Sequence, residues 1–504
     1  MQRLLFLLLT AIAYYAVPNA RPDLTRFNAD DSEAYVALSY ALTHGLGYTR
    51  SLVDGIYIPH TTWPPGMPAL LAPVLFGTHL PVDWLAIKLF IILIGLGGIV
   101  ICWFYVRRVS QSPAAADLAA LLLALAPFYW LFSRMALTEV PTIAFVFLAL
   151  LIVDLVWAGR RPPTWQIALA GLFCGVGMLL RSTIAGLIFV PLAYAAGPRR
   201  AELPTPRKYF LWALHAAAFC VPFLLWRERN RTIDTHVLGP DGVDQLRMLL
   251  TSDPTNQKSP LMTLPQFAHH LVDNAVHRII YHIPEQTLPW LWNLQWQGWP
   301  GAVFLAAGLT LVIGIAAIPR RWNTAPLFFV TATNALIVLV FSWGGSIRFW
   351  IPITSLLIVL VVIGIAPIWS GLRQTTRYAC IGILALAYGS SLLIFAREFM
   401  LHPYLGDFGD VIALLERVKS LPQAPVATYA EHFALVELET GDASPIGSAA
   451  MGPVPRYTNL LTRDRPTEYA RAFAIPPGAK EMFRAGEWSY YALPHPMTAD
   501  ELRK

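Results

Sequence analysis

Long apolar stretches separated by short polar segments fill most of the chain up to about residue 396. Crossing the hydrocarbon core of a bilayer takes about 20 apolar residues, and a packed or tilted helix can use a few fewer. On this criterion the sequence predicts an all-α polytopic membrane bundle of about eleven spanning helices. The predicted spans are residues 3–17, 83–106, 114–131, 140–158, 165–180, 183–197, 209–226, 300–318, 325–343, 350–369 and 378–396. The fifth and sixth are short and are separated only by Arg181-Ser182, which is typical of a hairpin that does not cross fully.

Basic residues collect in alternate connections between these spans. With a cytoplasmic N-terminus, every even-numbered span ends in a basic cluster, as the positive-inside rule requires. The clusters are Arg107-Arg108, Arg160-Arg161, Arg199-Arg200 with Arg207-Lys208, Arg320-Arg321, and Arg373 with Arg377. The pattern predicts that residues 18–82, 227–299 and the tail from about 397 lie on the outer side.

The first predicted span also has the form of a signal peptide, with Arg3 before an apolar run that ends at Val17. Cleavage after Ala20 would put Pro18 where a small residue is required. We therefore expect an uncleaved anchor.

The tail, residues 397–504, is predicted to be a small soluble outer domain of α/β type. Asp410 to Leu421 has a helical pattern, and Ala424 to Tyr429 is typical of a strand. Residues 1–396 then form the transmembrane region, and no internal repeat is visible in it.

Composition agrees with a membrane protein: 56% of the 504 residues are hydrophobic and only 13% are charged, against about a quarter charged in soluble domains. The four cysteines lie in apolar segments without a CxxC pair, so neither a disulfide framework nor a zinc site is indicated. Blocks of basic residues suited to nucleic acid are absent from the sequence.

The first outer loop carries an acidic cluster, Asp30, Asp31 and Glu33, at the start of a predicted helix that stops at Gly45. We expect this short helix to be amphipathic and to lie along the membrane surface. Helix capping by Asp30 and Glu33 accounts for one or two of the acids. A functional carboxylate is the alternative for the remaining one.

Other charges stand alone near the outer ends of spans. Glu139 opens the fourth span, where the helix dipole favours an acid. Arg134, Arg181 and Arg348 lie at the outer ends of spans, against the bias of basic residues towards the cytoplasmic side. Lys88 lies one turn inside the second span. Each cation alone is explained by snorkelling to lipid headgroups. Several of them around one site would suit a phosphate, which arginine binds with two parallel hydrogen bonds.

Six short motifs follow one another between about residues 25 and 355. They are Asp31 and Tyr35 with Gly45 and Gly47-Tyr48, Trp63-Pro64-Pro65-Gly66-Met67-Pro68, Arg134 to Glu139, Leu180-Arg181-Ser182-Thr183, Trp226 with Arg229-Asn230, and Arg348-Phe349 with Pro352. In this order they resemble the polyprenyl-phosphate-dependent GT-C glycosyltransferases of family 39 type. That group includes protein O-mannosyltransferases and the aminoarabinose transferase of lipid A.

The resemblance implies a transmembrane bundle with two outer juxtamembrane helices in the first loop. It implies inverting transfer of a sugar from a polyprenyl-phosphate-linked donor to a protein, lipid or glycan acceptor at the outer face of the bacterial cytoplasmic membrane. The tail domain would then be periplasmic, with membrane lipids around the bundle. Nucleic acid would not be a partner.

Site roles carried over by the resemblance fall into two sets. The catalytic acidic residues would be Asp31 and Glu139, with Asp30 beside them. The contacts to donor phosphate or substrate would be Lys88, Arg134, Arg181, Arg229, Arg348 and Tyr35.

One departure from the family pattern concerns a metal. Several members have an acid-Lys-Pro-Pro sequence in the first loop, where this chain has Thr62-Trp63-Pro64-Pro65. The change argues against a bound divalent metal and assigns the phosphate to Lys88 or an arginine. No cofactor is assigned with certainty, and His60 is a weak candidate metal ligand.

Two rival functions stay open at this point. A flippase for lipid-linked sugars would need polar groups along a central cavity, yet the spans carry almost no charge apart from Lys88 and Asp154. A polymerase or ligase with a diphosphate-linked donor would share the outer site. Only a donor assay separates that activity from monosaccharide transfer.

Overall fold

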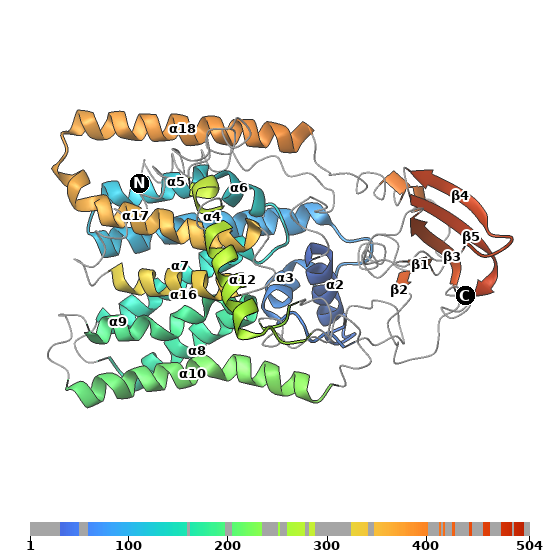
Figure 1. Cartoon of the computed structure of the whole chain (residues 1–504), viewed down its shortest axis with the longest axis horizontal. Coiled ribbons are helices and arrows are strands. Elements are labelled where there is room, and N and C mark those ends of the chain that lie inside the picture. The colour runs from blue at the N-terminus through green and yellow to red at the C-terminus, as the bar shows by residue number, and fades with distance from the viewer. Residues whose placement is uncertain are drawn as a thin grey trace.

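The computed structural model describes sixteen stretches of the chain. These are residues 31–49, 59–158, 162–196, 204–233, 250–252, 260–277, 282–287, 324–340, 347–401, 413–414, 417–418, 426–428, 443–445, 457–463, 475–485 and 488–497. They form a bundle of roughly parallel and antiparallel helices, with a β-sheet beyond one end of it (Figure 1). The predicted spans at 3–17 and 300–318, and Asp30, lie outside the described residues.

The other nine predicted spans coincide with helices. These helices are α4 (Trp84–Ser110), α5 (Pro113–Leu125) with α6 (Pro127–Phe132), α7 (Glu139–Ala158), α8 (Thr164–Leu180), η1 (Ser182–Phe189) with α9 (Val190–Ala196), α10 (Thr205–Arg231), α16 (Ala325–Val340), α17 (Ile351–Gly371) and α18 (Gln374–Leu401). Among the described residues, five helical segments are long and apolar enough to cross a membrane by themselves: Trp84–Ser110, Glu139–Trp157, Thr205–Arg231, Arg348–Pro367 and Gln374–Ile394. The helical membrane bundle is confirmed, while the number of eleven spans stays a prediction.

Local sequence explains where the third predicted span is interrupted. Ala126 precedes Pro127 and is extended, because proline disfavours the helical conformation of the residue before it. The third predicted span is therefore α5 followed by the short helix α6. Between the fifth and sixth predicted spans, Arg181 is extended, with α8 before it and the 3₁₀ segment η1 after it.

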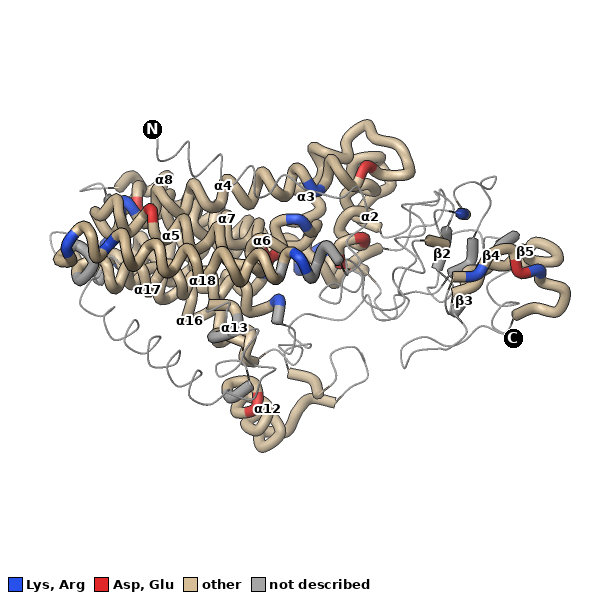
Figure 2. The backbone as a smooth tube through the Cα atoms, turned by 90° about the horizontal axis from the view of Figure 1, so that it is seen from above, with Lys and Arg blue, Asp and Glu red and all other residues tan. Residues whose placement is uncertain are grey.

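Charge is confined largely to the two ends of the bundle, and the stretch between them is made almost wholly of other residues (Figure 2). Arg107 and Arg108 end α4 at the end that lies away from α2 (Asp31–Thr43). The side of the membrane that each end faces stays a prediction.

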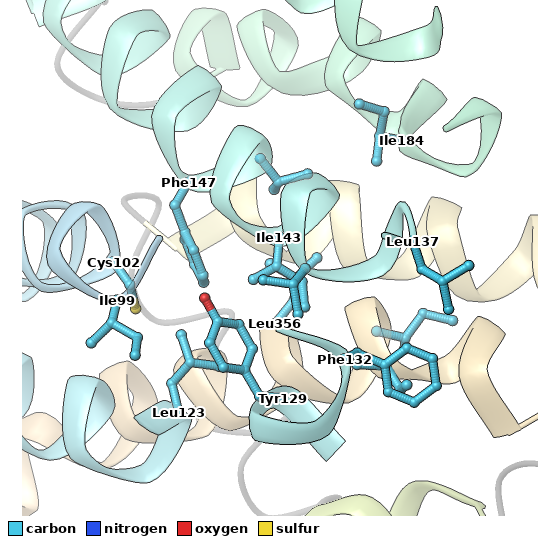
Figure 3. Packing of buried hydrophobic residues seen from close by; sticks show 14 of the residues in the cluster. Ile99, Cys102, Leu123, Tyr129, Phe132, Leu137, Ile143, Phe147, Ile184 and Leu356 are labelled. Carbon is cyan, nitrogen blue, oxygen red and sulfur yellow. The ribbon is translucent and has the colours of Figure 1, made fainter. Parts of the chain in front are cut away.

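Close packing at the centre of the bundle joins four helices around Tyr129 of α6 (Figure 3). Its hydroxyl donates a 2.7 Å hydrogen bond to the carbonyl of Gly95 in α4. Cys102 of α4, Phe147 of α7 and Leu356 of α17 belong to the same buried cluster. The polar tip of a buried tyrosine is thus satisfied while its ring fills apolar space.

Small residues let α8 and α10 approach each other along their backbones. A Cβ on Gly171 would lie 2.4 Å from the carbonyl oxygen of His215, and one on Gly175 would lie 2.2 Å from that of Phe219. This four-residue spacing of glycines is a common way for membrane helices to pack closely.

The first outer loop folds into α2 and α3 (Gly66–Leu75), which pack together. The helix predicted from Asp31 towards Gly45 is confirmed, and Gly45 adopts φ +76° just after it. Leu42 is its only exposed side chain, so α2 does not have the exposed polar face of an amphipathic helix, and its position along the membrane surface stays a prediction. Small residues such as Ala34, Ala37 and Ala41 allow neighbours to cover the remaining faces.

Two further helices come from the second outer region, residues 227–299: α12 (Leu264–His277) and α13 (Ile283–Thr287). Figure 2 shows α12 standing away from the main bundle. Asn274 ties it back, since its side-chain amide donates to the carbonyl of Leu339 at the end of α16.

The tail contains a mixed five-stranded sheet in the order β2-β1-β3-β5-β4. Its strands are β1 (Val426–Thr428), β2 (Ala443–Pro445), β3 (Tyr457–Arg463), β4 (Lys480–Ala485) and β5 (Trp488–Met497). β1 is parallel to β2 and β3, whereas β3, β5 and β4 are antiparallel. β1 lies within the predicted strand, and most of the predicted helix from Asp410 to Leu421 falls outside the described residues. Because α18 continues to Leu401, helix extends past the predicted boundary at 397.

Replacing Gly175 with alanine tests the α8–α10 contact. The added Cβ would meet backbone rather than a movable side chain, so we expect a loss of about 1–3 kcal/mol, as in other overpacked cores. Thermal unfolding of the detergent-purified protein measures it. Gly97→Ala in α4 is the matched control, since nothing lies within 4 Å of a Cβ there. Equal stability of the two variants would contradict the packing.

Candidate functional site

An ion pair joins the first outer loop to the end of the membrane bundle. Asp31 is the first residue of α2, and its carboxylate accepts a hydrogen bond from the guanidinium of Arg348. Arg348 lies in η8 (Ile347–Trp350), a 3₁₀ turn directly before α17. The two side chains are only 21% and 15% exposed. The pair therefore connects segments that are 317 residues apart in the sequence.

A second, more deeply buried ion pair joins α7 to the end of α8. Nη1 of Arg181 lies 2.9 Å from Oε1 of Glu139 and 2.7 Å from the hydroxyl oxygen of Thr138. Glu139 is 2% exposed and Arg181 is 9% exposed. Because an unpaired charge at this depth is expensive, each residue stabilises the burial of the other.

Phe349 connects the two ion pairs. Its ring centroid lies 5.2 Å from the guanidinium carbon of Arg181 and 5.1 Å from that of Arg348. Both distances are within the range of cation–π attraction. The two arginines, and with them Asp31 and Glu139, consequently belong to one site.

Tyr35 stands on α2 one turn after Asp31 and is buried at this site. Burial raises the pKa of its hydroxyl, and the carboxylates of Asp31 and Glu139 raise it further, while Arg348 and Arg181 act in the opposite direction. The phenol is therefore neutral across the physiological range. Its ring packs against Trp63 of the first loop, with 5.5 Å between the ring centroids.

The proline-rich loop is fixed beside Arg181 by Gly66. A Cβ at Gly66 would lie 2.4 Å from backbone atoms of Leu179 and Leu180, so only glycine fits there without a shift. This contact explains why the loop motif and the arginine motif occur together.

Arg229 and Asn230, at the end of α10, hold the other side of the first loop. Arg229 donates to the carbonyl of His60 at 2.8 Å, and the Asn230 amide donates to that of Thr61 at 2.9 Å. The Arg229 guanidinium also lies over the rings of Tyr48 and Trp226. The structure thus gives Arg229 a loop-holding contact, and its predicted contact to phosphate or acceptor stays a prediction.

His60, the candidate metal ligand, takes part in the loop itself. Its Nε2 accepts the backbone N–H of Trp63 at 2.9 Å, so this nitrogen is already engaged. In the described part of the chain, no group of three or more histidine, cysteine, aspartate or glutamate residues is placed to hold a metal. The described residues do not fit a metal centre at His60.

The remaining predicted cations lie on α4 and between α6 and α7. Lys88 is buried in the second turn of α4. The guanidinium of Arg134 lies 4.1 Å from the ring centroid of Trp130. Sequence reasoning did not identify Thr138 or Phe349 as parts of the site, although both stand inside motifs that it had singled out.

Comparisons with known proteins identify a related family and a similar fold. The family model described as dolichyl-phosphate-mannose-protein mannosyltransferase matches residues 64–226. A search of curated proteins finds no match. The matched residues include Glu139, Arg181 and Trp226, whereas Asp31 and Arg348 lie outside the match.

Solved structures give the fold. The chain is similar to ArnT from Cupriavidus metallidurans bound to undecaprenyl phosphate, with 12% identity, 97% of each chain covered and a TM-score of 0.57. For the apo state of that protein the identity is 12%, the match covers 97% of each chain, and the TM-score is 0.59. A third similar structure is the archaeal oligosaccharyltransferase AglB from Archaeoglobus fulgidus, in complex with an inhibitory peptide and a dolichol-phosphate. It is 12% identical, the match covers 88% of this chain and 64% of that chain, and the TM-score is 0.50.

The fold is similar to that of the GT-C glycosyltransferases, and the apolar helices are those of an integral membrane protein. Within that class, the family match and the shared fold confirm the resemblance to polyprenyl-phosphate-dependent transferases of the protein O-mannosyltransferase and aminoarabinose transferase type.

A double-mutant cycle tests the pairing of Asp31 with Arg348. Arg348→Gln leaves a carboxylate without its partner, so we expect a loss of about 3 kcal/mol in unfolding free energy. Adding Asp31→Asn removes the isolated charge and should recover most of that loss. Thermal unfolding of the two single variants and the double variant measures the coupling. Additive losses would show that the two side chains do not interact.

Proposed function

We propose that this chain transfers a sugar from a polyprenyl-phosphate-linked donor to an acceptor, with inversion, at the outer face of the cytoplasmic membrane. The observation that carries the proposal is the joining of two arginine–carboxylate pairs through Phe349. Bound undecaprenyl phosphate in one structural relative and dolichol-phosphate in another support a lipid-phosphate donor.

The arginines supply the donor's phosphate site. A guanidinium has five N–H donors, so Arg348 can contact Asp31 and still bind phosphate oxygens. In Arg181, Nη1 contacts Thr138 and Glu139, whereas Nη2 is buried without a hydrogen-bond partner among the described residues. That unused donor is available to a ligand oxygen.

Asp31 acts as the general base. Its carboxylate accepts the proton of the acceptor hydroxyl while the hydroxyl oxygen forms a bond to the anomeric carbon. The bond from that carbon to the phosphate oxygen breaks, and its electron pair leaves with polyprenyl phosphate. A single displacement of this kind inverts the anomeric centre and needs no general acid, since the leaving group is already an anion.

Glu139 keeps Arg181 in place for this reaction. The Glu139–Arg181 pair is buried at the end of α8, and Thr138 holds the same guanidinium nitrogen. Glu139 therefore orients a phosphate donor, whereas Asp31 faces the acceptor. The acceptor is a protein, lipid or glycan hydroxyl, and the tail domain lies on the periplasmic side of a bacterial inner membrane.

Asp31→Asn tests the base directly. The amide keeps the shape of the side chain but cannot take the proton, so sugar transfer should fall by about 10²–10⁴-fold. The assay uses purified protein in liposomes with a panel of radiolabelled polyprenyl-phosphate monosaccharides. Donor binding should change little by comparison, and transfer is compared at equal amounts of folded protein because the pairing with Arg348 is lost as well.

Asp83→Asn is the matched control. Asp83 is an outer carboxylate that caps α4 by accepting the N–H groups of Leu85 and Ala86, and asparagine caps equally well. We expect normal transfer from it. Near-normal turnover of Asp31→Asn would refute the role of Asp31. Turnover only with diphosphate-linked donors would indicate a polymerase or ligase, and passage of unchanged label across the bilayer would indicate a flippase.

A further inference from the structure

An asparagine is buried inside the bundle without a hydrogen-bond partner. Asn334 lies in α16 and is 1% exposed. Neither its Oδ1 nor its Nδ2 forms a hydrogen bond within the described part of the chain. Burying an unpaired amide costs about 1–3 kcal/mol by mutational measurements, and polar groups inside membranes usually have a function. The cost indicates that this amide has a partner other than the described residues of the chain.

Asn334 lies on the face of α16 that packs against η1. The same face carries the buried residues Leu327, Val330 and Val338. Val330 approaches Gly186 of η1 so closely that a Cβ there would lie 2.9 Å from the Val330 backbone. Asn334 is therefore one helical turn from this contact, towards the end of α16 at Val340.

That end of the helix reaches the functional site. Six residues separate Asn334 from Val340, which corresponds to about 9 Å along a helix. The same helix contacts η8, which carries Arg348, and η1 begins directly after Arg181. The unpaired amide thus lies on the membrane side of the two arginines.

Other polar atoms on the same elements lack partners among the described residues. These atoms are the Thr183 hydroxyl in η1 and the Trp350 Nε1 in η8, together with Nη2 of Arg181 and Oε2 of Glu139. Thr183 and Trp350 each follow a site arginine by two residues. Unused hydrogen-bonding groups therefore occur on η1 and η8 within two residues of the site arginines.

The segment η1 provides room for a local change. It is a 3₁₀ helix of eight residues, whereas such helices are usually three or four residues long because their hydrogen bonds are strained. A 3₁₀ stretch in line with α-helices often marks a functional hinge. A small shift of η1 against α16 would give a ligand access to Asn334.

We propose that Asn334 hydrogen-bonds to hydroxyl groups of the sugar on the lipid-linked donor and so helps to select that sugar. The inference rests on the proposed function, with the donor's phosphate held by Arg181 and Arg348. A hydroxyl both donates and accepts, which matches the two halves of the amide. A phosphate would leave the amide oxygen unpaired, and the hydrocarbon carrier offers no polar atom.

Asn334→Leu is the decisive variant. Replacing an unpaired buried amide with an apolar side chain of similar size should keep or raise the thermal stability of the ligand-free protein. The KM for the sugar-bearing donor should rise about tenfold, as expected for loss of hydrogen bonds worth roughly 1.4 kcal/mol. Inhibition by undecaprenyl phosphate, which lacks the sugar, should be unchanged.

Thr331→Val is the matched control on the same buried face of α16. The Thr331 hydroxyl already donates to the Leu327 carbonyl within its own helix, so its removal should leave the KM and the inhibition constant unchanged. A fall in the stability of Asn334→Leu with unchanged KM would overturn the assignment. So would an equal weakening of donor and undecaprenyl phosphate, because the contact would then involve the phosphate or carrier.

Binding measurements keep this inference separate from the proposed function. If wild type transferred no sugar, the proposed function would fail. The affinities for undecaprenyl-phosphate hexose and for undecaprenyl phosphate, measured by ligand-induced thermal shifts, would still decide the role of Asn334. Tighter binding of the sugar-bearing lipid by wild type but not by Asn334→Leu supports the role, and equal binding of both lipids by wild type overturns it.

Discussion

The end of the bundle that carries α2 depends on the need to neutralise buried charges. Burying a single ion costs several kcal/mol, which a partner with good geometry offsets. Arg181 pairs with Glu139 and Arg348 with Asp31, and both guanidinium groups lie against Phe349. These contacts bring α2, α7, the end of α8 and η8 to one place. The pairing of buried charges therefore both forms the site and holds these segments together.

Backbone contacts set the positions of the charged side chains. Gly66 lets the first loop touch the backbone at Leu179 and Leu180, one residue before Arg181. On the opposite side, Arg229 and Asn230 bind carbonyl groups of the same loop. An arginine at the end of α10 thus acts on the site through the loop. The packing of Tyr35 against Trp63 links α2, and with it Asp31, to the described part of this loop.

Sequence alone predicted the bundle because apolar length and basic clusters are local signals. It also singled out Arg134, Arg181 and Arg348, since they depart from the basic bias. It could not predict which acid pairs with which arginine, because Asp31 and Arg348 are 317 residues apart. The burial of α2 was missed for a related reason: α3 covers a face that the pattern alone assigns to the membrane surface. The 3₁₀ form of η1 was also hidden, as short apolar runs do not distinguish it from an α-helix.

The charge balance of the site favours the products of the proposed reaction. Two arginines and two carboxylates sum to zero before substrate binds. A polyprenyl-phosphate sugar is a phosphodiester with one negative charge, and the released phosphate monoester carries about −1.5 to −2 at pH 7. Negative charge therefore grows on the leaving group as the bond to the sugar breaks, beside guanidinium donors that are already in position. Stabilisation that increases towards the transition state accelerates the reaction, whereas equal binding of the donor would not. In the proposed reaction, transfer of the acceptor proton to Asp31 would leave Arg348 without its anionic partner and free its N–H groups for the phosphate. The ion pair would thus couple base catalysis at Asp31 to departure of the phosphate.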